Sequence, residues 1–199
     1  MSAQIKNVVA TAELGCPVNL DHLSSCNIMA HYVPQKFSGL LIRKLKPFKS
    51  HCQVYRNGKI TVNGARSTEQ AQILANMYCD LIKKQGYKNA EVKNFKVVNI
   101  VASLNLGFPV KLENLHKFFD RVIYEPEIFP GASFRLIECE TTCVMFHSGK
   151  CNFLGAKTEL DIEAASLEVT LSLSPSDPLT AKRNDDTGHE CDLSGGSFG

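Results

Sequence analysis

The 199 residues carry 22 Lys and Arg against 20 Asp and Glu, and 44% of them are hydrophobic, a composition that supports a globular core. No apolar run reaches the roughly 18 residues that a membrane span needs, and the opening residues lack the pattern of a signal peptide. The eight cysteines follow no regular spacing, so we expect reduced, mostly packed thiols in a cytosolic or nuclear protein.

The first half of the chain alternates short strands with two helices. The expected elements are a strand at 5–14, a helix from Pro17 to about Ile28, and strands at about 38–46, 50–56 and 58–63. Asn57-Gly58 predicts a tight hairpin between the last two strands. Ser67 and Gln70 have the spacing of a capping box, so they predict a helix that starts there and ends at Gly86.

The second half predicts the same elements in the same order. They are a strand at about 95–105, a helix from about Pro109 to Phe119, and strands at about 132–138, 142–147 and 150–154. Ser148-Gly149 predicts the hairpin turn, and Thr158 with Asp161 predicts the start of the last helix. Residues 87–94 are the expected linker. From Ser172 the periodic pattern ends in serine, proline and aspartate.

The two halves are copies of each other. Residues 7–20 return at 99–112 with a shift of 92, and residues 64–67 return at 155–158 with a shift of 91. A period near 90 is too long for a solenoid unit. The predicted units are a first repeat at 1–92, a second repeat at 93–171 and a disordered acidic tail at 172–199. Two copies of one α+β unit are expected to share a sheet and form a pseudo-twofold molecule, a shape that suits the near-twofold DNA duplex.

Charge is distributed unevenly between the repeats. Residues 1–92 hold 12 Lys and Arg against 5 Asp and Glu, whereas residues 93–173 hold 8 against 10 and residues 174–199 hold 2 against 5. A basic first repeat can attract phosphates, whereas the net negative charge of the second repeat repels them. An uneven but otherwise inert solvated surface is the alternative.

Two aromatic residues recur in each copy, one at the start of a strand and one before a hairpin. They are Phe37 with Tyr55, and Phe129 with Phe146. Pairs of this kind at the two ends of a concave sheet could enter base steps and kink a duplex from the minor groove. Core packing is the usual fate of a single Phe, but the duplication of the whole set favours the wedge interpretation.

Asn7 and Asn99 occupy matching places inside apolar strands, beside Val9 and Val101. An asparagine on such a surface needs a partner. Its amide can donate to adenine N3 or thymine O2 in the minor groove.

The chain resembles the TATA-box-binding protein family over residues 6 to about 170. The stretches that carry the resemblance are 124–131 (Tyr-Glu-Pro-Glu-Ile-Phe-Pro-Gly), 32–37 (Tyr-Val-Pro-Gln-Lys-Phe), Asn57-Gly-Lys59, Ser148-Gly-Lys150 and Gly155-Ala-Lys157. The resemblance implies an α+β saddle, with a ten-stranded curved antiparallel sheet whose underside meets DNA and four helices on the convex face. It also implies a general transcription initiation factor of the nucleus that needs no cofactor, metal, membrane or small-molecule substrate.

The resemblance assigns roles position by position. Phe37, Phe129 and Phe146 match wedge residues, with Tyr55 in the fourth place. Asn7, Asn99, Val9 and Val101 match the centre of the groove surface. Phosphate contacts are expected from Lys36, Arg43, Lys59, Arg66, Arg135, Lys150 and Lys157. The loop that in the family meets transcription factor IIB is Tyr124, Glu125, Pro126 and Glu127, and the loop near transcription factor IIA is Tyr32, Val33, Pro34 and Gln35.

Several positions depart from the family pattern. Asn63 and Leu154 stand where the family has groove threonines, and Thr61 and Asn152 replace valines that lie on base edges. Glu138, Glu140 and Phe48 replace basic residues, which should weaken the salt-sensitive part of binding. These changes leave a second hypothesis open, a scaffold of the same fold with weak TATA specificity that acts mainly through protein partners.

An enzyme or zinc protein is the third hypothesis. His51-Cys52 suggests a nucleophile, and the set Cys139, Cys143, His147 and Cys151 suggests a zinc site. The second set runs along strands, whose side chains alternate between two faces, and it contains no Cys-x2-Cys pair. No glycine-rich phosphate loop is present either. We therefore expect no enzymatic activity and no metal.

Overall fold

The structure is a computed structural model that describes residues 2–26, 29–47, 49–139 and 141–173. Ile28, Phe48, Glu140 and residues 174–199 of the expected tail lie outside the described residues. The first repeat contains β1 (Gln4–Glu13), α1 (Leu20–Cys26), β2 (Ala30–His31), β3 (Leu40–Lys44), β4 (Ser50–Val54), β5 (Lys59–Ala65) and α2 (Thr68–Lys84). The second contains β6 (Lys93–Asn105), the 3-10 helix η1 (Leu112–Lys117), β7 (Gly131–Arg135), β8 (Thr142–Phe146), β9 (Lys150–Ala156) and α3 (Glu159–Ser172).

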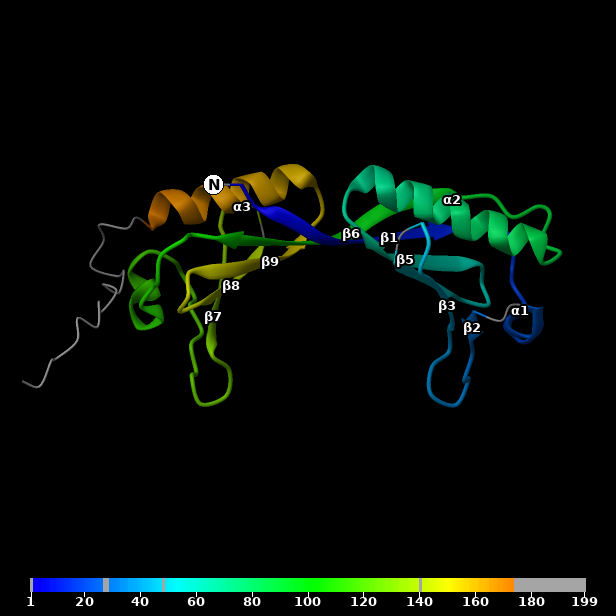
Figure 1. Cartoon of the computed structure of the whole chain (residues 1–199), viewed down its shortest axis with the longest axis horizontal. Helices are drawn as coiled ribbons and strands as arrows, with labels where there is room; N and C mark the ends of the chain where they lie inside the picture. The colour runs from blue at the N-terminus through cyan, green and yellow to red at the C-terminus, as the bar shows by residue number, and fades with distance from the viewer. Residues whose placement is uncertain (1, 27–28, 48, 140, 174–199) are drawn as a thin grey trace, which may run out of the picture.

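The nine strands of the described residues form one antiparallel sheet in the order β2-β3-β4-β5-β1-β6-β9-β8-β7. The long strands β1 and β6 pair at its centre, so each repeat supplies one half of the sheet. Figure 1 shows α2 and α3 along one face, while two loops extend from the opposite ends of the sheet on the other side. The prediction that both repeats share one pseudo-twofold sheet is confirmed.

The helices cover the convex face with an apolar side. Alternate residues of β1, namely Val8, Ala10 and Ala12, are buried beneath them. The Ser67 hydroxyl caps α2 by accepting the Gln70 N–H, at 3.1 Å. The buried side of α2 is Ala71, Leu74, Ala75, Tyr78, Cys79 and Ile82.

The implied count of ten strands is wrong by one among the described residues. In the first repeat β2 pairs with β3 through two residues, Ala30 and His31. In the second repeat the matching contact is the single bridge between Ile123 and Ser133, which exchange both backbone hydrogen bonds at 2.8 and 2.9 Å. Arg121 lies just before it with a φ of 52°, a left-handed conformation that takes the chain out of the extended form. The tenth strand is therefore reduced to one bridge.

The two short helices differ because one is capped and the other is not. The Asn19 side-chain oxygen accepts the N–H groups of Asp21 and His22, both at 3.1 Å, at the start of α1. The matching residue of the second repeat is Lys111, which makes no side-chain cap hydrogen bond before η1. A lysine has no acceptor for these N–H groups. α1 begins three residues after the predicted start at Pro17, and η1 is shorter at both ends than the predicted 109–119.

On the convex side, an acidic residue of α3 forms hydrogen bonds with the first residue of α2 and so links the two repeats. Glu159 Oε1, in the first turn of α3, accepts from the N–H and the hydroxyl of Thr68, both at 3.1 Å. Thr68 opens α2, so the N-terminal ends of both helices share one carboxylate, which their dipoles favour. Within the described ranges, no helix has the length and apolar character to span a membrane.

Candidate nucleic-acid interface

The concave face is formed by the strand residues that alternate with the core. In β1, Asn7, Val9 and Thr11 are half-buried and point away from the helices, because successive side chains of a strand point to opposite faces. The same alternation places the predicted groove residues of β5, β6 and β9 on this face. The residues that it brings there are Thr61, Asn63, Asn99, Val101, Asn152 and Leu154.

Two asparagines and two valines form the centre of this face. Asn7 pairs with Val101 and Val9 pairs with Asn99 across β1 and β6. Each asparagine oxygen accepts a glycine N–H from the same repeat at 2.9 Å, Asn7 from Gly64 and Asn99 from Gly155. The bonded oxygen fixes the orientation of each amide, so its NH2 group remains as a donor toward the concave side.

The predicted aromatic wedges form two matching pairs. The ring centroids of Phe37 and Tyr55 are 6.1 Å apart at 64°, and those of Phe129 and Phe146 are 5.8 Å apart at 61°. Phe37 is 43% exposed and Phe129 is 47% exposed, so these rings are not core residues.

A glycine lies beside each aromatic pair. A Cβ on Gly39 would come within 2.7 Å of the Phe37 ring, and a Cβ on Gly131 would come within 2.7 Å of the Phe129 ring. Real Cβ contacts are never this short, so these positions need glycine if the rings are to keep their place. The recurrence of Gly39 and Gly131 at the repeat interval is the sequence signal for this supporting role.

Tyr55 differs from the other three wedge residues by its hydroxyl. The hydroxyl donates to Gln53 Oε1 at 3.3 Å, two residues earlier on the same face of β4. A half-buried tyrosine hydroxyl needs such a partner. Gln53 was not among the predicted site residues, and only the i, i+2 spacing along the strand indicates this contact.

Between the central asparagines and the aromatic pair, the concave face is more polar in the first repeat than in the second. We call this part of each repeat the floor; in the first repeat it consists of Gln53, Thr61, His51 and Asn63. Gln53 lies opposite Thr61, and His51 lies opposite Asn63. Burial first, and then the nearby Arg43 charge, lower the pKa of His51, which favours the neutral imidazole.

The second repeat pairs polar with apolar side chains at the matching positions. Val144 lies opposite Asn152, and Thr142 lies opposite Leu154. The predicted polar substitutions therefore lie on the concave surface in both repeats, but they are most concentrated in the first.

The predicted phosphate-contact residues are all exposed. They are Lys36, Arg43, Lys59, Arg66, Arg135, Lys150 and Lys157. A hollow of about 510 Å³ in the first repeat is lined by Lys6, Lys49 and Arg66 together with Gln70, Gly64 and Pro47. Its counterpart in the second repeat, of about 580 Å³, joins Arg135 and Lys157 to Glu138 and Asp161. The charge asymmetry of the sequence is thus present at two matching places on the surface.

The two predicted partner loops each end in a turn, and the two turns have the same hydrogen-bond pattern. Val33 O accepts the N–H groups of Lys36 and Phe37, both at 3.0 Å, and Glu125 O accepts those of Ile128 and Phe129, at 3.0 and 2.9 Å. The turns hold Phe37 and Phe129 against the sheet. The remaining predicted loop residues are half-buried Tyr32 and Tyr124, with exposed Pro34, Gln35, Pro126 and Glu127.

The cysteine and histidine set does not converge. Cys143 and Cys151 are buried in the core, whereas His147 Nδ1 lies 3.0 Å from Val110 O near the hairpin. Burial raises the pKa of Cys52, which keeps this thiol protonated. Among the described residues, no three His, Cys, Asp or Glu side chains could hold a metal.

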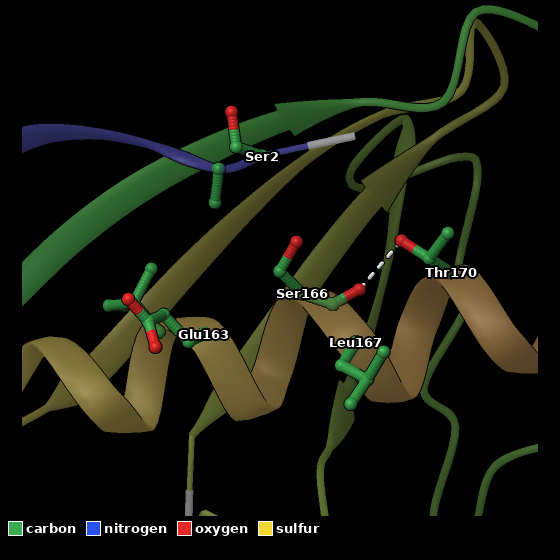
Figure 2. A pocket seen from close by; sticks show the side chains of 7 residues that line it. Ser2, Glu163, Ser166, Leu167 and Thr170 are labelled. Atoms are coloured by element: carbon green, nitrogen blue, oxygen red, sulfur yellow. Dashed lines mark hydrogen bonds between the residues drawn. The ribbon is translucent and has the colours of Figure 1, made fainter.

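A hollow of about 410 Å³ lies on the opposite side, between the first residues of the chain and α3 (Figure 2). Figure 2 shows Glu163, Ser166, Leu167 and Thr170 along its helical wall, where the Thr170 hydroxyl donates to Ser166 O at 2.7 Å. Glu163 is the one titratable residue of its lining. The lining of this hollow contains no phosphate-binding loop.

Comparison with known proteins shows the family to which the fold belongs. The model of the family described as transcription factor TFIID, or TATA-binding protein, matches residues 2–85 and 94–174. The chain belongs to the TATA-binding protein family. The two segments of the chain that the family model matches correspond to the two repeats of the sheet. The structure of Methanococcus jannaschii TBP superposes with a TM-score of 0.74 at 30% identity, over 86% of this chain and 98% of that one.

Three relatives in the TATA-binding protein family share the same identity with this chain. TATA-box-binding protein-like 1 of Entamoeba histolytica is 34% identical over 83% of this chain and 76% of its own length. The TATA-box-binding protein of Xenopus tropicalis is 34% identical over 81% of this chain and 54% of its own length. TATA box-binding protein-like 2 of Takifugu rubripes is 34% identical over 81% of this chain and 50% of its own length. The chain thus spans about half the length of the vertebrate relatives.

Proposed function

We propose that this chain is a nuclear transcription initiation factor that binds promoter DNA on its concave face and bends it through the minor groove. The observation that carries the proposal is the pair of aromatic clusters at matching ends of one face, with two oriented amide donors between them. Exposed rings can enter base steps, and amide donors match the acceptors that A·T pairs present in this groove.

The exposed basic residues around this face supply the sequence-independent attraction to phosphates. The two loops that end in the same turn are the proposed contacts for transcription factor IIA, at Tyr32, Val33, Pro34 and Gln35, and for transcription factor IIB, at Tyr124, Glu125, Pro126 and Glu127. Turns of identical hydrogen bonding support these loops as preformed surfaces. No cofactor and no catalytic step enter this proposal.

Fluorescence anisotropy on a duplex with a TATA element, with an end-to-end FRET pair on the same duplex, tests binding and bending together. The expected result is a saturable anisotropy rise with a FRET increase from bending, which weakens steeply with salt. Binding without a FRET change would contradict the wedge mechanism, and no binding at low salt would contradict the DNA-binding function.

A second candidate function is favoured by the polar floor of the first repeat. A·T preference depends on apolar groups that exclude the guanine amino group, and Thr61, Asn63 and Asn152 weaken that exclusion. A scaffold of this kind would hold promoters only together with transcription factors IIA or IIB. Competition between TATA and scrambled duplexes separates the two functions, since a preference of about a thousandfold by the isolated protein would contradict the scaffold.

A further inference from the structure

The four asparagines of the concave face are of two kinds. Asn7 and Asn99 each bond their oxygen to a glycine N–H, which fixes the orientation of the amide and keeps its NH2 group toward the concave side as a donor. Within the described residues the side chains of Asn63 and Asn152 have no hydrogen-bond partner. An unbonded amide can rotate and present either its oxygen or its NH2 group.

This difference matters because of what each base pair offers in the minor groove. A·T pairs present only the acceptors adenine N3 and thymine O2, while a G·C pair adds the guanine N2 amino donor. A donor or an apolar group facing that amino group leaves it without an acceptor, which is costly in a desolvated contact. A side chain that can present an oxygen or an unprotonated nitrogen satisfies it.

Groups with this ability gather in the first repeat. The cross-strand pairs Gln53–Thr61 and His51–Asn63 form a block of four adjacent polar side chains. The lowered pKa of His51 favours a ring nitrogen that can accept. Gln53 Oε1 accepts from Tyr55 and keeps a second lone pair.

The second repeat has only part of this block. At the positions matching Gln53 and Asn63 it has Val144 and Leu154, so Asn152 is flanked by apolar groups. Thr142 takes the place of His51. The two halves of the face therefore offer different chemistry to the two halves of a binding site.

We infer that the first-repeat half of the concave face binds a minor-groove half-site that contains G·C pairs, whereas the centre and the second-repeat half require A·T. The inference rests on the proposed function, namely that this face binds duplex DNA in the minor groove. It assigns the recognition of the guanine N2 amino group to Asn63 and Thr61, with Gln53 and His51 beside them.

Substitution of adenine by 2,6-diaminopurine tests this directly, because it adds the N2 amino group to an A·T pair and keeps thymine as the partner, with a third hydrogen bond to thymine O2. Anisotropy titrations would compare an all-A·T duplex with duplexes modified in one flank, in both flanks, or in the centre. The protein can turn on a near-twofold site and place a single modified flank under the first repeat. That duplex is expected to bind at least as well as the all-A·T duplex, whereas the other two are expected to lose about tenfold or more.

Two variants make the test specific to these residues. Thr61→Val with Asn63→Leu makes this part of the first repeat apolar, and a single modified flank should then cost the roughly tenfold or more that two modified flanks cost the unchanged protein. Leu154→Asn, at a side chain that is 36% exposed, should instead restore binding to the duplex modified in both flanks. Circular dichroism would establish that each variant is folded, and Leu154→Asn keeps the test decisive if the first variant does not fold.

The outcomes separate this inference from the function on which it rests. Binding of the all-A·T duplex with a loss of about tenfold or more from a single modified flank would overturn the inference and leave the proposed function intact. Failure to bind even the all-A·T duplex at low salt would overturn the proposed function, and this inference with it.

Discussion

Asn7 lies directly opposite Val101 where the two central strands pair. The repeat relates this pair to a second pair, Val9 opposite Asn99. The four side chains therefore form a quartet with approximate twofold symmetry. Because each asparagine oxygen is held by a glycine N–H, the two amide donors have one orientation before any ligand arrives. Preorganised donors lose little conformational entropy on binding.

Asn7→Asp should reduce DNA affinity without unfolding the protein. The carboxylate still accepts the Gly64 N–H, but the NH2 donor is gone and a negative charge faces the groove acceptors. Each lost base contact costs about 1–3 kcal/mol, so affinity should fall about tenfold to a hundredfold in an anisotropy titration. Asn19→Asp is the matched control, since Asn19 also accepts backbone N–H groups but lies at the start of α1. Equal losses in both variants would contradict a role for the quartet.

Phe129→Ala with Phe146→Ala should abolish the bend-dependent FRET change. Phe129 is 47% exposed and Phe146 is half-buried, so the folded state should survive their removal. At the other end, Tyr55 must carry its hydroxyl into the base stack, and Tyr55→Phe should deepen the bend and strengthen binding. An unchanged bend in the double variant would argue against the wedges, and weaker binding by Tyr55→Phe would argue that this end does not intercalate.

Gly131→Ala should displace a wedge ring without changing the wedge residue itself. The new Cβ would lie 2.7 Å from the Phe129 ring and 3.1 Å from the Phe146 ring, so one ring has to move. An aromatic pair contributes about 0.5–1.5 kcal/mol, and we expect a severalfold loss of affinity with a smaller FRET change. Gly39→Ala should act in the same way on Phe37, whereas Ser148→Ala in the exposed turn should do neither.

Glu138→Lys should raise the affinity for any duplex and steepen its salt dependence. Glu138 lines the same hollow as Arg135 and Lys157, where a carboxylate repels phosphates. Each added phosphate contact steepens the slope of log affinity against log salt by about 0.9. Lys49→Glu, in the matching hollow of the first repeat, should shift the slope in the opposite direction. A slope that neither variant changes would place both hollows away from the DNA.

Stability should fall at alkaline pH because of Tyr78. Burial raises the pKa of Tyr78 to about 12, against about 10 in an unfolded chain. The folded state then keeps a proton that the unfolded state releases, so this contribution is complete below about pH 10 and is lost as pH rises to about 12.

Urea unfolding at about pH 9 and about pH 11 measures this loss. Tyr78→Phe should lose about 1 kcal/mol at the lower pH, through the hydrogen bond with Ser50, and should show a smaller alkaline decline. Tyr124→Phe, outside the core, should keep the full decline. An equal decline in all three proteins would show that another group dominates alkaline unfolding.

The duplication made most of the fold predictable. Two copies of one pattern imply two copies of one structure, and the strands and long helices appear within a few residues of the predicted bounds. The exceptions arise where matching residues differ. Asn19 caps α1 but Lys111 cannot cap η1, and a left-handed Arg121 reduces the tenth strand to a bridge.

The site could be predicted in residue types but not in contacts. The alternation of the strands is sufficient to place Asn7 and Asn99 on the concave face. The bonds from Gly64 and Gly155 that orient them join residues more than 50 positions apart, which no local pattern encodes. Gln53 was missed for a related reason, since its role depends on a tyrosine hydroxyl that the usual wedge does not carry.

The pairing of β1 with β6 gives the molecule the construction of a homodimer fused into one chain. Each repeat alone would leave a long central strand with an unpaired edge, which is a template for pairing with another chain. A single repeat in isolation could close that edge by pairing with a second copy of itself, under true twofold symmetry. In one chain the two halves need not be identical, so the polar block and the basic hollow of the first repeat differ from their counterparts in a way that a symmetric dimer does not allow.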